Sequence, residues 1–344
     1  MIQNSNTMLS SSSSFLKGFI GNLTNNNAQL GSAMFFEDIC VKFDGNFKVE
    51  SNSFEIFQDR SQGFGAVTLY RAHIFLYGQT TFANNQKTGL VLDYSYVHLY
   101  EKLELDGNVG IEGGGMALYG QSQIIVKDAN AQMQVTDNKA SKGAGIYVQY
   151  SSQFVTAWKT NFLPINNCFI RFDVTSIKTR IFFKNNNNES DIFTNSLRPC
   201  ADSNDLLSFF LNSTDFDFNH NKKAITTDTV RIHLPESPVW ENMYAGKITV
   251  PIELYDEANN TVSELVKIEI KDTNGVNISL EEGHNYLIPR NNKVQFRLLI
   301  GQRPDVNFTL VFSVQSVAVP TVERKTTFKY CPFGYFFQGK HVFV

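Results

Sequence analysis

The sequence predicts an all-β protein in which a right-handed parallel β-helix is followed by an antiparallel β-sandwich. Three observations predict this fold: a motif that recurs along the first two thirds of the 344 residues, short runs of alternating apolar and polar residues, and a change of pattern near residue 225. The 30 phenylalanines, together with abundant asparagine, favour pleated sheets joined by tight turns. No convincing helical stripe exceeds two turns, so we expect no long helix.

The recurring motif is an apolar residue followed three positions later by Asn and then by a cluster of small residues. Clear copies lie at 82–89, 105–116 and 135–146, and degraded copies at 23–34 and 57–67. The small-residue anchors of these copies are 33, 24, 26 and 30 residues apart, at Ser32, Gly65, Gly89, Gly115 and Gly145. Units of this length without a helix suit one coil of a parallel β-helix, stacked at about 4.8 Å.

Each corner of the predicted coil has its own chemistry. Small residues allow a sharp turn, and Asn at the next corner can stack on Asn of the neighbouring coil and bond the turn amides. Val97, Leu99, Leu103 and Leu105 share one parity, which predicts strands with one buried face. A β-sandwich of Asn-Gly hairpins is the alternative, but such folds do not usually repeat a two-corner motif in order.

The motif weakens toward residue 222, where we place the end of the β-helix. It reappears at 181–193 and 216–221, but its spacing breaks between 151 and 180, where a loop or a wider coil is expected. From about 225, alternating strands are separated by polar turn clusters. This pattern predicts an Ig-like or cadherin-like sandwich over 223–320, although the Cys…Trp…Cys core of true immunoglobulin domains is missing.

Composition limits the partners and the compartment. The net charge of −3 and the lack of a basic stripe argue against nucleic acid as a partner. The sequence has no run of eighteen apolar residues, so we expect no membrane span and no membrane contact in this segment. The first residues do not resemble a signal peptide, so the chain is either cytosolic or part of a larger extracellular protein. The larger protein is favoured because the sequence begins with what reads as part of a repeat, ends soon after Cys331 and has four cysteines and six glycosylation sequons. The sequons are at Asn22, Asn188, Asn212, Asn259, Asn277 and Asn307.

The runs Gly113–Met116, Gly143–Ile146 and Cys331–Tyr335 carry a resemblance. The repeat resembles that of polymorphic outer-membrane proteins and of relatives in large animal extracellular proteins, where a pectin-lyase-like β-helix precedes a β-sandwich and an EGF-like cysteine-rich array. The resemblance makes 321–344 the start of a truncated cysteine-rich module. It implies a surface-exposed adhesive or structural role and no catalytic residues. Two places depart from the pattern: Arg60 stands in place of the Asn, and Ser190-Asp191 stands in place of the Gly pair.

The four cysteines suggest disulfide bonding rather than a metal site. Cys168 and Cys200 flank a repeat-like unit, and a disulfide between them would close a loop of about 32 residues; the alternative is two free thiols in a cytosolic protein. Cys40 is expected to be buried as a small hydrophobe, and Cys331 to pair beyond the chain end. No CxxC spacing exists, so we expect no zinc.

Other candidate sites have ordinary interpretations. The run 215–221 begins like a calcium loop, but His220 replaces the required Gly, so a strand is favoured. Asp256 and Glu257 are expected in a solvated turn. His73 and His98, 25 residues apart, could stack on the outer surface of neighbouring coils.

Outward acids leave an enzymatic alternative open. A β-helix enzyme acting on polysaccharide needs paired acids, or an acid with Lys or Arg, on adjacent coils. The acids here are scattered and accompanied by Lys102 and Lys127, which favours a solvated face; they are Asp93, Glu101, Glu104, Asp106, Asp128 and Asp137. We therefore expect a non-enzymatic extracellular segment without catalytic, cofactor or metal residues. The alternatives are a carbohydrate-active lyase or hydrolase and a bacterial adhesin passenger.

Overall fold

The structure is a computed structural model and divides into two compact units, Met1–Thr227 and Asp228–Val344. It is all-β, as predicted, and the described residues contain no α-helix. None of their helices is long and apolar enough to cross a membrane. The structure describes residues 8–9, 21–26, 33–53, 65–150, 168–173, 180–186, 190–195, 216–217, 224–244, 246–271, 278–283, 285–300, 306–314, 319–329, 336–338 and 341–343.

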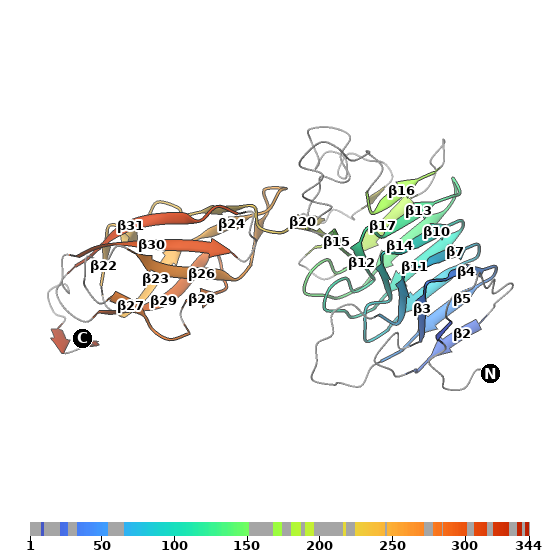
Figure 1. Ribbon diagram of the computed structural model, residues 1–344, viewed down its shortest axis with the longest axis horizontal. Coiled ribbons are helices and arrows are strands. Elements are labelled where there is room, and N and C mark those ends of the chain that lie inside the picture. The colour runs from blue at the N-terminus through green and yellow to red at the C-terminus, as the bar shows by residue number, and fades with distance from the viewer. Residues whose placement is uncertain are drawn as a thin grey trace. The chain divides into compact units, whose positions relative to one another are not determined.

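The first unit consists of three parallel sheets (Figure 1). The first sheet contains β1 (Met8–Leu9), β3 (Met34–Glu37), β6 (Val67–Tyr70), β9 (Leu90–Asp93), β12 (Met116–Gly120), β15 (Ile146–Tyr150), β18 (Ile192–Thr194) and β20 (Ile225–Thr227). The second contains β4 (Cys40–Phe43), β7 (His73–Leu76), β10 (Tyr96–Leu99), β13 (Gln123–Val126) and β16 (Ile170–Phe172). The third contains β2 (Gly21–Thr24), β5 (Phe47–Glu50), β8 (Thr80–Ala83), β11 (Lys102–Asp106), β14 (Gln132–Thr136), β17 (Arg180–Lys184) and β19 (Phe216–Asp217).

From β3 to β15 the chain visits the three sheets in rotation, and we call one passage a coil. Alternate residues are buried in third-sheet strands, as the sequence pattern predicts; in β11, Leu103 and Leu105 are buried between half-buried neighbours. In the first sheet, by contrast, β9 and β12 each bury three consecutive residues. Parallel register aligns these side chains in columns, one of which is Val49, Phe82, Leu105, Val135 and Phe183. The columns remove continuous apolar surface from water, which is the main favourable term in folding.

The corner after the third sheet carries an asparagine ladder, as expected from the motif. From Asn52 onward, each Oδ1 accepts hydrogen bonds from the backbone N–H and Nδ2 of the Asn one coil earlier. The members are Asn26, Asn52, Asn85, Asn108, Asn138 and Asn186. Asn52 follows Val49 by three positions and occupies the ladder, so the expectation that Arg60 replaces the asparagine is wrong.

Small residues precede the strands of the first sheet, but two anchors are displaced by one residue from those expected. The register Met34–Val67–Leu90 places Ala33 and Ala66, rather than Ser32 and Gly65, level with Gly89. Steric crowding explains the small residues, because a Cβ on Gly89 would lie 2.8 Å from the Gly115 carbonyl oxygen.

One coil after Gly145 the corresponding corner holds an acid. The register of β15 and β18 places Asp191 level with Gly145, in line with the expected departure from the Gly pair. Its carboxylate accepts a hydrogen bond from Nδ2 of Asn186 at 2.8 Å, so it terminates the donor end of the described ladder.

The second unit consists largely of antiparallel strands. A three-stranded sheet contains β21 (Arg231–His233), β24 (Glu253–Tyr255) and β25 (Thr261–Val262); another contains β23 (Gly246–Pro251), β29 (Lys293–Ile300) and β27 (Ile278–Leu280). The largest contains β22 (Asn242–Met243), β31 (Val322–Phe328), β30 (Val306–Val314), β26 (Val266–Lys271) and β28 (Tyr286–Leu287). Short η2 (Pro238–Trp240) places Trp240 in the core, edge-on to Phe312 at 5.9 Å. A separate hairpin joins β32 (Phe336–Gln338) to β33 (His341–Phe343).

Two expectations for this unit need correction. Strand β31 pairs with β30, so the sheet continues past residue 320, where the sequence placed the start of another module. Asp256 is 1% exposed rather than solvated, and its carboxylate accepts hydrogen bonds from the backbone N–H groups of Ala258 and Asn260. The expected boundary at 222–223 and the run Cys331–Tyr335 lie outside the described residues.

Candidate functional site

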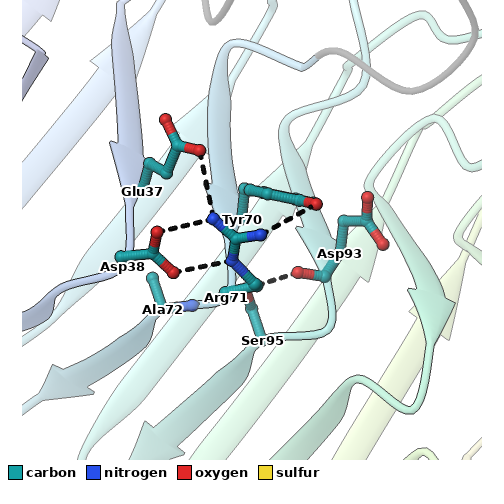
Figure 2. Close-up of polar contacts among 7 residues, drawn as sticks. All are labelled: Glu37, Asp38, Tyr70, Arg71, Ala72, Asp93 and Ser95. Carbon is teal, nitrogen blue, oxygen red and sulfur yellow. Dashed lines mark hydrogen bonds and ion pairs between the residues drawn. The ribbon is translucent and has the colours of Figure 1, made fainter. Parts of the chain in front are cut away.

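The corner between the first and second sheets presents charged and aromatic side chains from successive coils. We call Glu37, Asp38, Tyr70, Arg71 and Asp93 the corner site (Figure 2). Asp38 and Arg71 have positive φ values, 51° and 48°. That conformation is unfavourable for residues with a Cβ, and such strain concentrates at functional sites.

Arg71 binds acids of the preceding coil, as Figure 2 shows. Its Nε and Nη2 donate to the two carboxylate oxygens of Asp38 at 2.6 and 2.5 Å, and Nη2 also lies 3.3 Å from Glu37 Oε1. The guanidinium lies over the Tyr70 ring, 4.3 Å from its centroid. The hydrogen bonds from Arg71 hold the pKa of Asp38 below its usual value.

The next coil supports the corner through backbone and serine contacts. The Arg71 N–H donates to the carbonyl of Asp93 at 2.9 Å, and the Ala72 N–H donates to Ser95 Oγ at 2.9 Å. The Ser95 N–H in turn donates to Ser122 Oγ at 3.0 Å, which makes a short serine ladder. The carboxylate of Asp93 points away from the guanidinium in Figure 2, and burial raises its pKa.

The outer face of the second sheet begins two residues beyond Arg71 and is aromatic. It contains, from β7, β10 and the turns that follow them, His73, Phe75, Tyr77, Tyr96, His98 and Tyr100. Phe75 stacks on His98 with centroids 4.3 Å apart, and Tyr77 stacks on Tyr100 at 4.1 Å. Lys42 lies 4.3 Å from the Tyr77 ring centroid. Because these rings stack on one another, much of their apolar surface is already covered within this group of side chains.

His73 and His98 meet, as the sequence suggested, but they are not directly opposite each other in register. Strand register pairs His73 with Tyr96 and His98 with Phe75. The two imidazoles are nevertheless joined diagonally, with His73 Nδ1 3.1 Å from His98 Nε2. This contact could not be derived from a spacing of 25 residues alone.

The acids singled out from the sequence lie on different surfaces. Glu104, on the third sheet, forms an ion pair with Lys102 and accepts hydrogen bonds from Thr81 and Gln79. Asp106, on the same strand, accepts a hydrogen bond from Thr136.

The remaining acids lie in turns. Asp128 accepts a hydrogen bond from the backbone N–H of Asn130, and Asp137 occupies a left-handed turn position with φ of 54°. Glu101 is exposed, and Lys127 pairs with Asp173 at 2.7 Å. The structure therefore places only Asp93 of the predicted acids at the corner site. Sequence reasoning missed Glu37, Asp38 and Arg71, whose contact spans 33 residues.

The cysteines differ from one another in state. Cys40 is a free thiol and is half-buried on the outer side of β4, opposite His73, so the expectation of a fully buried Cys40 is wrong. Cys168 is disulfide-bonded. Its expected partner Cys200 lies outside the described residues, so this pairing stays a prediction. The described part of the chain contains no group of three or more His, Cys, Asp or Glu side chains suited to a metal ion.

Three of the predicted glycosylation sequons can be placed. Asn22, Asn259 and Asn307 are exposed. Asn307 Oδ1 accepts a hydrogen bond from Thr327 at 2.8 Å. The sequons at Asn188, Asn212 and Asn277 and the calcium-like run 215–221 cannot be judged in this way, because their asparagines and most of the run lie outside the described residues.

Comparison of the chain with protein-family models, curated proteins and solved structures finds no significant match.

Proposed function

We propose that this chain is a non-enzymatic structural and adhesive segment of a large extracellular surface or matrix protein. In this proposal the three parallel sheets close into a right-handed, pectin-lyase-like β-helix, and the second unit is an Ig-like or cadherin-like sandwich. The rotation of the chain through three sheets and the buried asparagine ladder support a stiff scaffold. Its outward side chains are then free to contact an extracellular protein or glycan.

The observation that carries the non-enzymatic part is the pairing of outward acids with cations. Asp38 binds Arg71 through two oxygens, and Glu104 binds Lys102. Asp173 is similarly held between Lys127 and Arg171. A carboxylate that is held ionised by a neighbouring cation is a poor proton donor near neutral pH.

A carbohydrate-active enzyme is the second candidate, and one observation favours it. The corner site combines an arginine, acids from an adjacent coil and Asp93, whose pKa is raised by burial. An acid with a raised pKa can serve as a general acid toward a glycosidic oxygen. Asp93 is therefore the residue on which this alternative depends.

Incubation with a panel of neutral, acidic and amino polysaccharides separates the two candidates. The wild-type chain, Asp93→Asn, Asp38→Asn and the control Glu101→Gln would be assayed for new reducing ends and unsaturated sugars. We expect no turnover above the heat-denatured sample for any of them. Turnover that Asp93→Asn or Asp38→Asn abolishes and Glu101→Gln retains would overturn the non-enzymatic proposal.

A further inference from the structure

We propose that His73 and His98 form an acid-sensitive switch on the outer face of the second sheet. The two rings are joined while both are neutral, and acidification separates them and opens the stack that covers Phe75. This inference is independent of whether the chain is adhesive, because it depends only on the local geometry of β7 and β10.

His98 lies in a buried, aromatic environment. Its side chain is 9% exposed, and its ring is nearly parallel to Phe75, with centroids 4.3 Å apart and an angle of 6°. Its Nε2 lies 3.1 Å from His73 Nδ1. Its other nitrogen, Nδ1, is buried and has no hydrogen-bond partner in the described structure.

This geometry selects one tautomer. If His73 donated from Nδ1, neutral His98 would carry its proton on Nδ1, and a buried N–H group would lack an acceptor. If His98 donates from Nε2, its Nδ1 keeps only a lone pair, which costs less to bury. The favoured state is therefore a hydrogen bond from His98 Nε2 to His73 Nδ1.

Protonation of either ring is incompatible with this state. An imidazolium at His98 would place an N–H group on the buried Nδ1. An imidazolium at His73 would have a proton on Nδ1, where it would oppose the donor of His98 and force the unfavourable tautomer. The simplest relief is for His98 to leave its stack, which uncovers Phe75.

Surrounding groups do not offset this effect. Those that face the pair from the neighbouring strands and turns are Cys40 and Lys42 on β4, Tyr96 on β10, Lys127 after β13, and Arg171 and Asp173 in and after β16. Burial, His73 and Lys127 lower the pKa of His98 to about 4, and Asp173 only partly opposes them. Burial also lowers the pKa of His73. Lys42 is engaged by Asp44 at 2.8 Å.

Acid destabilises the folded chain through both histidines. Both histidines have a lower pKa in the folded chain than the value of about 6.5 expected when unfolded. Between about pH 6.5 and 4 the unfolded chain therefore binds more protons, and stability falls as the pH falls. The loss precedes titration of most carboxylates, whose unperturbed pKa values are about 4.

The test follows the ring signals of the full chain by NMR, and the exchange of the β7 and β10 amides, from pH 8 to 4. We expect His98 to titrate at its lowered pKa of about 4 and His73 below its ordinary value, and exchange corrected for its intrinsic rate to rise about tenfold or more at the acid end. His98→Phe keeps a ring on Phe75 and removes the buried nitrogen, so it should abolish the rise. The exposed control His233→Gln should leave the rise unchanged.

Three results would overturn the proposal. One is ordinary titration of both wild-type rings near pH 6.5, and this result does not depend on any variant folding. Another is acid-induced exchange in His98→Phe equal to that of the wild type. The third is an exchange rise that His233→Gln removes, because this would place the acid response in the second unit.

Discussion

The backbone N–H and the side-chain Nδ2 of Asn85 both donate to one oxygen, Oδ1 of Asn108, at 3.1 and 2.8 Å. Asn108 then donates from Nδ2 to Asn138 Oδ1 at 3.1 Å and to the carbonyl of Phe82 at 2.9 Å. The buried side-chain amide of Asn108 thus donates two hydrogen bonds and accepts two. The corner is a continuous, polarised ladder, and each coil depends on the one before and after it.

Asn108→Ala tests the energetic weight of this ladder. The change leaves both donors of Asn85 and the carbonyl of Phe82 without their partner in a buried corner, at about 1–3 kcal/mol for each unsatisfied group. We expect a loss of about 3 kcal/mol or more in urea unfolding followed by circular dichroism. The matched control is Asn130→Ala, at an exposed turn, which should cost less than about 0.5 kcal/mol. Equal effects of the two substitutions would contradict the ladder.

Gly113→Ala tests the requirement for small residues at the loops between coils. Gly113 has a φ of +65°, and an added Cβ would lie 2.0 Å from the carbonyl oxygen of Met116. Left-handed backbone costs a residue with a Cβ about 1–2 kcal/mol, and the clash adds to this. Gly283 has a φ of +82°, and an added Cβ would meet nothing within 4 Å, so Gly283→Ala measures the cost of the left-handed backbone without a clash. Thermal unfolding should therefore show a clearly larger loss for Gly113→Ala than for Gly283→Ala, and the reverse order would argue against this packing.

Tyr150 couples the first sheet to the start of β16 and should make the first unit sensitive to alkali. Its hydroxyl accepts a hydrogen bond from the Phe169 N–H at 3.1 Å, and burial raises its pKa. A raised tyrosine pKa contributes stability that is present below about pH 10 and is lost as the pH rises above that value.

Two variants measure this contribution. Tyr150→Phe should cost about 1–3 kcal/mol at neutral pH, because it leaves a buried N–H group without its acceptor. It should also reduce the alkaline loss of stability measured by denaturant unfolding between pH 8 and 11. Tyr286→Phe, at a side chain that is 49% exposed, should change neither quantity measurably. A wild-type-like alkaline profile in Tyr150→Phe would show that another group is responsible.

The asparagine corners could be predicted from the sequence because their signature is local: the apolar residue and the Asn three positions later lie on one strand and its turn. Asn52 was missed because the motif can be aligned either on Val49, with Asn52 three positions later, or on Phe57, with Arg60 three positions later. The hydrogen bond between Asn52 and Asn85 decides for the first alignment. The sandwich was expected to end at residue 320, before β31, because Val322 and Phe328 are the only apolar residues of that strand and give no alternating pattern.

The corner site could not be predicted in the same way. Asp38 and Arg71 are separated by 33 residues, and their contact depends on coil lengths that vary along the chain. The serine ladder of Ser95 and Ser122 was also missed, since serine in a turn is too common to be a signal. The shared parity of Val97 and Leu99 correctly predicted that His98 points outward, but it could not tell that diagonal rings, rather than register partners, would share a hydrogen bond.

The most direct test of the central claim is site-resolved mass spectrometry of the chain after passage through the secretory pathway of a eukaryotic host. We expect folded, secreted protein with N-glycans on the exposed Asn22, Asn259 and Asn307, an oxidised Cys168 and a free Cys40. Unmodified sequons, together with a chain that reaches its fold only when its thiols are reduced, would contradict an extracellular scaffold.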